Sequence, residues 1–103
     1  MAKLQAKQHW TKEARKFFRD ITKKFHIDEK HHATFYGTCE NLNRFYLANT
    51  DIMENGITFK TASGTIHKNP ACAIQKEAWG AYIVGLRALG LYEPQGKVGN
   101  PGG

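Results

Sequence analysis

Histidine and cysteine side chains are the groups in this chain that could bind a metal or act as nucleophiles. His31 and His32 are adjacent and precede Cys39, while His67 and Cys72 form a second candidate group. Zinc ligands usually recur as CxxC or HxxxH pairs, and no pair here has that spacing. On a helix, adjacent side chains also point about 100° apart, because one turn takes about 3.6 residues. We therefore predict no metal site, and both cysteines are expected to be small buried apolar side chains.

Other catalytic arrangements are equally missing from the sequence. The stretch GKVG at 96–99 comes nearest to a phosphate-binding loop, but it lacks the GxxxxGK[ST] spacing and a preceding strand. The acidic residues are few and scattered, so no close carboxylate pair suits a two-metal nuclease. The sequence predicts no catalytic residue, no cofactor and no enzymatic activity.

The positive charge of the chain is concentrated near its N-terminus. Residues 1–24 carry eight basic and two acidic side chains, and the rest carry seven of each, so the whole net charge of +6 lies in this segment. Such a concentration indicates an anionic partner. Lysine and arginine without exposed aromatic neighbours favour phosphate contacts over base stacking. The candidate DNA-binding residues are Lys3, Lys7, Lys12, Arg15, Lys16, Arg19, Lys23 and Lys24.

A first helix is expected to present most of these side chains. Thr11 is a typical N-cap, and Glu13 in the first turn suits the positive end of the helix dipole. A 3.6-residue period then gathers basic residues on one side and apolar residues on the other. The apolar side comprises Trp10, Ala14, Phe17, Phe18, Ile21 and Phe25. This pattern predicts an amphipathic helix whose aromatic side packs in the core.

A long second helix is expected to follow. Asp28 is its predicted N-cap, and no strong stop follows until Asn55-Gly56, where glycine can take the left-handed conformation that ends helices. If unbroken, this helix spans on the order of 40 Å, because each residue adds about 1.5 Å. A helix of that length is awkward in a lone globule of 103 residues and natural in an assembly.

A hairpin and a third helix complete the pattern. Residues 57–68 alternate in polarity around Gly64, which predicts two short strands joined by a turn. Asn69 is expected to cap the third helix, with Pro70 as its first residue and Gly90 as its exit. The predicted fold class is therefore mainly α, with a basic amphipathic helix, a long helix, a short β-hairpin and an apolar C-terminal helix.

The third helix is apolar on nearly all sides, which indicates burial on two faces. One row of its residues is small enough for another backbone to approach closely. We expect part of this row, or of the second helix, to lie in a subunit interface. The row could instead pack on the second helix within one chain. The candidate interface residues are Phe35, Cys39, Leu42, Tyr46, Ala71, Ala78 and Gly85.

A single helical domain is expected over residues 10–92. A flexible basic lead-in over 1–9 should precede it, and a disordered tail over 93–103 should follow. Apolar runs stay well short of the roughly 20 residues that a membrane span needs, and the basic N-terminus leads into no signal-peptide core. We expect a soluble protein with no membrane partner.

The order of these elements resembles that of a known protein family. Over about residues 10–92, a basic helix, a long helix, the stretch GITFKTASGTIHKNPA and a helix ending in RALGL follow one another. In this order and spacing, the chain resembles the small terminase subunits of tailed bacteriophages, in particular those whose last helix opens with Asn-Pro. The residues that carry the resemblance most specifically are Gly56, Gly64, Asn69-Pro70 and Leu89-Gly90-Leu91.

The resemblance implies a non-catalytic DNA-packaging factor that forms a homo-oligomeric ring and binds double-stranded viral DNA in the host bacterial cytoplasm. It also implies a partner, the terminase large subunit, which would carry the ATPase and nuclease. Many members have a separate N-terminal helix-turn-helix domain, but only about nine residues precede the first helix here. DNA contact would then fall to the basic helix. The alternative is a helical structural or adaptor protein whose basic end binds an acidic protein, and binding to duplex DNA separates the two.

Overall fold

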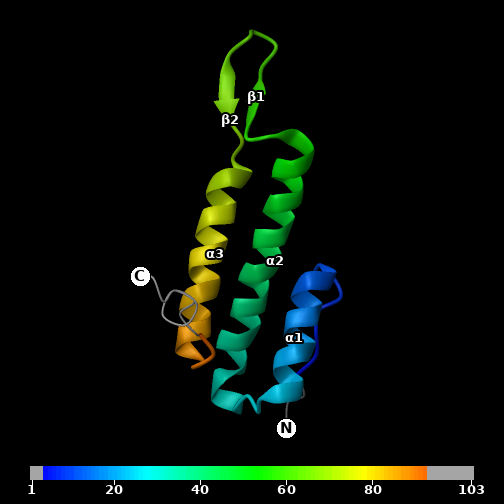
Figure 1. Cartoon of the computed structure of the whole chain (residues 1–103), viewed down its shortest axis with the longest axis vertical. Helices are drawn as coiled ribbons and strands as arrows, with labels where there is room; N and C mark the ends of the chain where they lie inside the picture. Colours follow the sequence, from blue (N-terminus) through cyan, green and yellow to red (C-terminus); the bar gives the residue numbers. More distant parts are fainter. Residues whose placement is uncertain (1–3, 93–103) are drawn as a thin grey trace, which may run out of the picture.

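The fold consists of helices packed side by side, with a β-hairpin projecting from one end (Figure 1). The computed structural model describes residues 4–92, so the tail expected over 93–103 lies outside the described residues. The described elements are α1 (Lys12–Lys24), a 3-10 turn η1 (Glu29–His31), α2 (His32–Asn55), β1 (Thr58–Lys60), β2 (Ile66–Lys68) and α3 (Ala71–Ala88). α3 runs antiparallel beside α2, and α1 lies along the half of α2 nearer its N-terminus. The predicted fold class, mainly helical with a short hairpin, is confirmed.

Thr11 begins α1 in the way that the sequence predicts. Its Oγ1 accepts a hydrogen bond from the Ala14 N–H at 3.2 Å, which satisfies one of the free N–H groups of the first turn. The backbone N–H of Thr11 donates to Oδ1 of the buried Asn43 at 2.7 Å. Asn43 thereby fixes the start of α1 against the middle of α2.

Residues 4–9 lie against α2, although their sequence predicts a flexible lead-in. Leu4 and Ala6 pack on the core. The Gln5 N–H donates to the Tyr36 hydroxyl at 2.8 Å, and that hydroxyl donates to the Gln5 carbonyl at 3.1 Å. These contacts join residues far apart in the chain, so they leave no local periodicity in the sequence.

The entry into α2 differs from the prediction. Asp28 occupies the cap position, but its carboxylate makes no capping hydrogen bond and lies 3.5 Å from Nε2 of His26. Its backbone carbonyl instead accepts from the His31 N–H at 2.8 Å, which closes η1. A turn with i→i+3 bonds therefore precedes α2. α2 ends at Asn55 as predicted, with Gly56 at a φ of 84°.

The β-hairpin extends beyond the helices, and both of its strands are exposed (Figure 1). The strands pair antiparallel, with Thr58 opposite Lys68, Phe59 opposite His67 and Lys60 opposite Ile66. Gly64 takes a φ of 89° in the turn, a conformation that favours glycine. A two-stranded hairpin is marginal in water by itself, so this one depends on how its base is held.

Asn69 holds that base by joining the hairpin, α2 and α3 at one point. Its Oδ1 accepts from the Ala71 N–H at 2.9 Å, while its Nδ2 donates to the Gly56 carbonyl at 2.8 Å and the Asp51 carboxylate at 3.0 Å. Pro70 already has helical angles, with φ −57° and ψ −23°. Asn69 therefore caps α3 and Pro70 opens its first turn, as the sequence predicts.

Replacing Asn69 with alanine should lower the free energy of unfolding by about 2 kcal/mol, the upper end of the range for a lost N-cap. The upper end is expected because the residue is only 7% exposed and its loss leaves the Ala71 N–H and the Gly56 carbonyl without this partner, while Asp51 keeps its hydrogen bond from Asn55. Urea unfolding measures the change. The matched control is Asn55→Ala, which removes an exposed hydrogen bond to the same Asp51 carboxylate. Equal losses for the two variants would contradict the joining role of Asn69.

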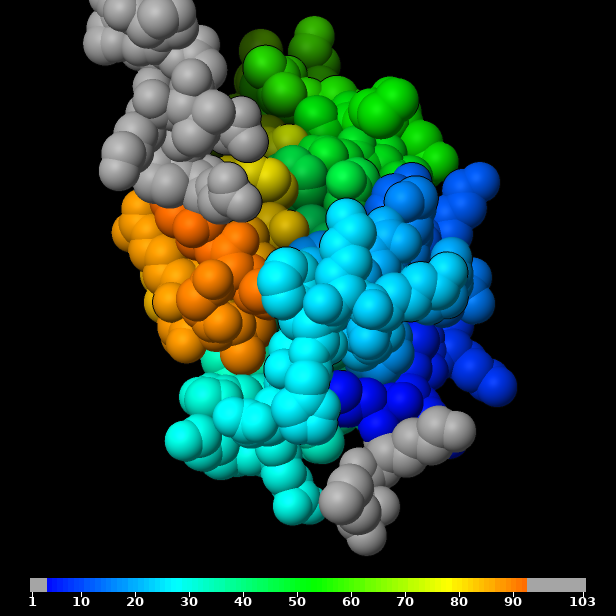
Figure 2. Space-filling model, turned by 60° about the horizontal axis from the view of Figure 1, so that its bottom comes forward, coloured from blue at the N-terminus to red at the C-terminus, as the bar shows by residue number. Residues whose placement is uncertain are grey.

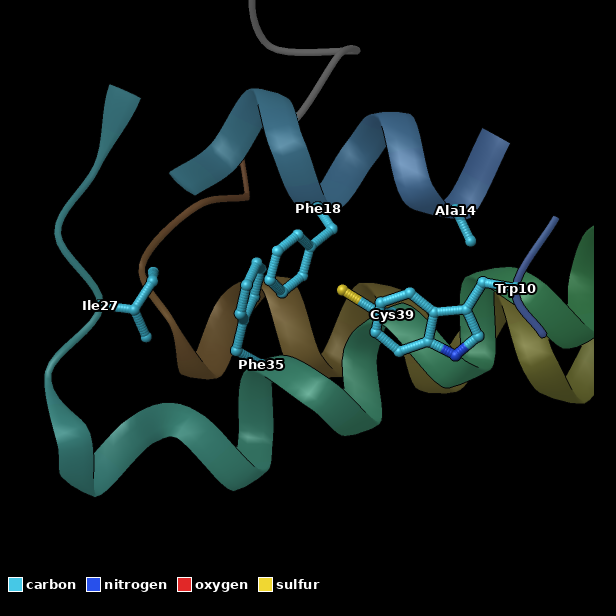
Figure 3. Close-up of a cluster of buried hydrophobic side chains, with 6 residues drawn as sticks. All are labelled: Trp10, Ala14, Phe18, Ile27, Phe35 and Cys39. Atoms are coloured by element: carbon cyan, nitrogen blue, oxygen red, sulfur yellow. The ribbon is translucent and has the colours of Figure 1, made fainter. Parts of the chain in front are cut away.

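The core lies between α1 and the α2–α3 pair (Figure 3). The Phe18 ring of α1 stacks on the Phe35 ring of α2, with centroids 5.3 Å apart. Phe17 continues the contact to Tyr82 of α3 at 5.5 Å, so α1 covers part of one face of the pair. Burial raises the pKa of the Cys39 thiol to about 12, and the thiol packs as a neutral apolar group. The buried cluster comprises Trp10, Ala14, Phe18, Ile27, Phe35 and Cys39.

Most of the candidate interface residues fill contacts within one chain. Five of them are at most 5% exposed, namely Phe35, Cys39, Leu42, Ala71 and Ala78. Gly85 faces Thr38 so closely that a Cβ at position 85 would lie 2.1 Å from the Thr38 Oγ1. Tyr46 is half-buried. The small-residue row therefore packs on α2 within the chain, and a second copy would have to meet other side chains.

Candidate nucleic-acid interface

The basic side of α1 faces away from the rest of the described chain. Ala14 and Phe18, on the opposite side of the helix, are buried against α2. In the space-filling view, the light-blue segment of α1 faces the viewer with no other described segment over it (Figure 2). The exposed basic residues of this helix are Lys12, Lys16, Arg19, Lys23 and Lys24. We refer to Lys12, Lys16, Arg19 and Lys23, which recur at helical spacing, as the basic stripe.

The basic stripe has dimensions that suit a nucleic-acid backbone. From residue 12 to residue 23 it spans about 16 Å, since a helix rises about 1.5 Å per residue. A DNA strand carries one phosphate per roughly 3.4 Å of helix axis, so this length passes several successive phosphates. The stripe can therefore place several cations along one strand without any change in backbone conformation.

Asp20 partly neutralises the stripe. The Lys16 Nζ donates to the Asp20 Oδ2 at 2.7 Å, and this hydrogen bond lowers the pKa of the Asp20 carboxyl. Both side chains are largely exposed, so the pair adds little stability, and Lys16 could exchange the carboxylate for a phosphate. The unpaired charge of the stripe thus comes mainly from Lys12, Arg19 and Lys23.

Arg15 and Lys7 differ from the stripe in their surroundings. Arg15 is half-buried, and its Nε is buried without a hydrogen-bond partner among the described residues. The Lys7 Nζ lies 5.1 Å from the centroid of the Tyr36 ring, whose face attracts the cation. Lys3 lies outside the described residues. Of the eight candidate residues, six thus lie on α1, and five of these six are exposed.

The part of the chain that the structure describes contains neither a cluster of metal-ligating side chains nor a membrane-spanning helix. Within residues 4–92, no three histidine, cysteine, aspartate or glutamate side chains lie where they could hold one metal ion. His9 contacts Glu40 at 3.2 Å, but this is an exposed surface pair. No helix of this part is long and apolar enough to cross a membrane.

The sequence did not reveal an apolar groove between α2 and α3. It comprises a hollow of about 590 Å³ and an adjoining one of about 250 Å³. No residue of α1 lines it. The sequence places Ile74, Ala78 and Ala81 in one row of α3, but a single sequence does not tell that α2 covers only part of that row. The lining includes Arg44, Leu47, Ala48, Ile74, Ala78 and Ala81.

Comparison with known proteins places this geometry in a family. Residues 6–94 match the family described as phage terminase, small subunit. Neither a curated protein nor a solved structure matches the chain. Members of the family are generally non-catalytic, which agrees with the lack of a catalytic pattern in the sequence. The match spans nearly the whole described fold, from the packed lead-in to the end of α3, and the chain therefore belongs to the phage terminase small-subunit family.

Proposed function

We propose that this terminase small subunit binds double-stranded viral DNA through the basic stripe of α1, forms a closed homo-oligomeric ring and delivers the DNA to the large subunit. The observation that carries the proposal is the stripe itself, exposed cations in register on one side of a helix whose other side is buried. The ATPase and nuclease activities reside in the large subunit, and the complex acts in the host bacterial cytoplasm.

DNA contact through the stripe is directed mainly at phosphates. Direct reading of bases typically uses a cluster of asparagine, glutamine and arginine side chains that reach the base edges. The exposed side of α1 instead carries lysines, with Arg19 as its exposed arginine. Sequence preference should therefore be modest, while the ring repeats the stripe and adds weak contacts by multivalency.

Ring formation is supported by apolar side chains that the single chain leaves uncovered. Leu47, Ile74, Trp79 and Val84 on α2 and α3 are each at least 44% exposed, as are Phe59 and Ile66 in the hairpin. Leu47 and Ile74 line one hollow, and exposed apolar side chains that gather in this way mark interaction sites more often than those that lie singly. A second copy of the chain would remove these side chains from water.

The mass of the particle in solution tests the proposal directly. We expect light scattering after size exclusion to give a mass well above that of two chains of 11.6 kDa, and we expect the particle to co-elute with a duplex of several helical turns. A monomer mass that does not depend on concentration would contradict the ring. A ring that fails to retain duplex at low salt would contradict the DNA-binding part.

A further inference from the structure

The α2–α3 pair has two partly exposed surfaces on different sides. One is the groove, whose lining includes Ala78 and Ala81. The other, which we call the aromatic ridge, consists of Phe45, Trp79 and Tyr82. Tyr82 contacts Phe17 of α1, so the ridge lies on the face of the pair that α1 partly covers. In an α-helix, Trp79 points about 100° away from Ala78 and further still from Ala81, so ridge and groove lie on different sides of α3.

The groove is hollow because its floor is made of small residues. Ala48 and Ala78 are buried beneath it, and Ala81 borders it without filling it. Leu47 and Ile74 form its apolar walls and are 53% and 47% exposed. Arg44 lines both hollows and brings a cation to this surface, where the other polar lining residues are Asn41, Asp51 and Glu77. A large flat apolar group with an affinity for cations would fit such a surface.

Trp79 is such a group, and it is held rigidly. Its ring lies 4.8 Å from the Phe45 ring and 5.2 Å from the Tyr82 ring, measured between centroids. These two neighbours fix the indole, yet 44% of the residue remains exposed. Rigid, half-exposed tryptophans lose little entropy on binding and are enriched among residues that dominate protein interfaces.

Ridge and groove also lie at the same level along the helix pair. Phe45, which packs on Trp79, directly follows the groove residue Arg44, and Trp79 directly follows the groove residue Ala78. A contact between unlike surfaces repeats from copy to copy, and it closes into a ring when each copy is rotated by a whole fraction of a full turn without a shift along the axis. This geometry suits a second copy of the chain as the occupant of the groove.

We infer that Trp79 of one copy docks into the α2–α3 groove of the next copy, with its indole face against Arg44. The inference rests on the proposed ring and names the surfaces that build it. An arginine beside a tryptophan face gains a cation–π attraction. The charges beside the two surfaces are complementary for this contact. Lys76 lies three residues before Trp79, on the ridge side of α3, whereas Glu77 lines the groove.

Two variants separate the ridge from the groove. Trp79→Ala removes the docking group and leaves the groove intact, while Ala81→Lys obstructs the groove and leaves the ridge intact. The new lysine would follow Glu77 by four residues, a favourable helical pair that should keep α3 stable. Each variant alone is expected to raise the dissociation constant for assembly at least tenfold, as loss of a central tryptophan typically does. Light scattering should then report monomers at concentrations where the wild-type chain assembles.

Mixing the two variants provides the decisive measurement. The Trp79→Ala chain keeps an intact groove, and the Ala81→Lys chain keeps an intact ridge. One contact can therefore form between the two chains and no further copy can add, so an equimolar mixture should form a species of two chains and nothing larger. The matched control is Gly80→Lys, which adds the same charge at the residue directly before Ala81, where a Cβ meets no other atom within 4 Å. It should assemble like the wild type. Far-ultraviolet circular dichroism shows whether each variant is folded, and Arg44→Ala gives a second groove variant without added bulk.

The outcomes distinguish the inference from the proposed function. Wild-type assembly with no loss in folded Trp79→Ala and Ala81→Lys would overturn the docking inference and leave the proposed ring standing. Loss of assembly in both variants, with no two-chain species in the mixture, would overturn docking between unlike surfaces. A wild-type chain that is itself monomeric would overturn the proposed ring, whatever the variants do.

Discussion

Replacing Gly85 with leucine is expected to lower the free energy of unfolding by about 3 kcal/mol, the upper end of the usual cost of overpacking. Even a Cβ at this position would lie 2.1 Å from the Thr38 Oγ1 and 3.0 Å from the Thr38 Cβ. Thr38 cannot easily move aside, because it is 2% exposed and its hydroxyl donates to the Thr34 carbonyl at 2.7 Å. The two helices would therefore have to separate. Urea unfolding followed by circular dichroism measures the loss.

The matched control is leucine at the other glycine of α3. A Cβ at Gly80 meets no other atom within 4 Å, so Gly80→Leu should raise stability by up to about 1 kcal/mol through helix propensity alone. A third variant, Thr38→Ala, removes the Oγ1, which is the atom that a side chain at position 85 would meet first. The cost of Gly85→Ala should be smaller in that background. Equal stability of Gly85→Leu and Gly80→Leu would contradict the close approach of α2 and α3.

Features of the fold that depend on local sequence could be predicted. Thr11, Asn69 and the exit glycines Gly56 and Gly90 act within a few residues of themselves, by capping or by a positive φ, and the structure places each in that role. Asp28 shows the limit of this reasoning. Its type and position suit a cap, but a 3-10 turn takes up the chain there and its carboxylate faces His26. A capped helix start and a 3-10 turn are both compatible with this sequence, and a single sequence does not show which of them forms.

Features that depend on contacts between distant residues could not be predicted. Gln5 is anchored by Tyr36 and Thr11 by Asn43, and neither pairing leaves a periodic trace in the sequence. The same reason explains why residues that pack within the chain were predicted to lie in a subunit interface. Periodicity shows that Ala78 and Gly85 share an apolar row, but not whether α2 or another copy covers it. The exposure of Trp79 could likewise not be predicted, because it depends on which residues of α3 the neighbouring helices cover.

The basic stripe was predictable because helical spacing alone defines it. The exposure and the ion pairing of each basic side chain were not predictable. The sequence offers Arg15 as an equal member, yet its Nε is buried. Lys16 is paired with Asp20, four residues later. Lys12, Arg19 and Lys23 remain exposed without a carboxylate partner among the described residues. These three are therefore the cations whose removal should affect DNA binding with little effect on folding.

The triple variant Lys12→Gln, Arg19→Gln, Lys23→Gln is expected to lose most of its affinity for duplex DNA at low salt. Glutamine retains helix propensity, so α1 should still form. Each lost phosphate contact reduces the steepness of the log–log salt dependence by about 0.9, which gives up to about 2.7 for each copy that contacts DNA. A titration of labelled duplex across a range of salt concentrations measures both affinity and slope, beside the particle mass that shows whether the ring persists.

The charge-matched control is Lys30→Gln, Lys60→Gln, Lys68→Gln, which removes three exposed lysines outside α1. If long-range attraction by net charge governs binding, the two triple variants should weaken it equally, because they carry the same charge. If the stripe makes the contacts, the α1 variant alone should lose slope, since counterion release follows the cations that meet phosphates rather than the total charge. Equal slopes for the α1 variant and the wild type, at unchanged mass, would exclude α1 as the DNA-binding surface. The anionic partner of this helix would then have to be sought among acidic proteins.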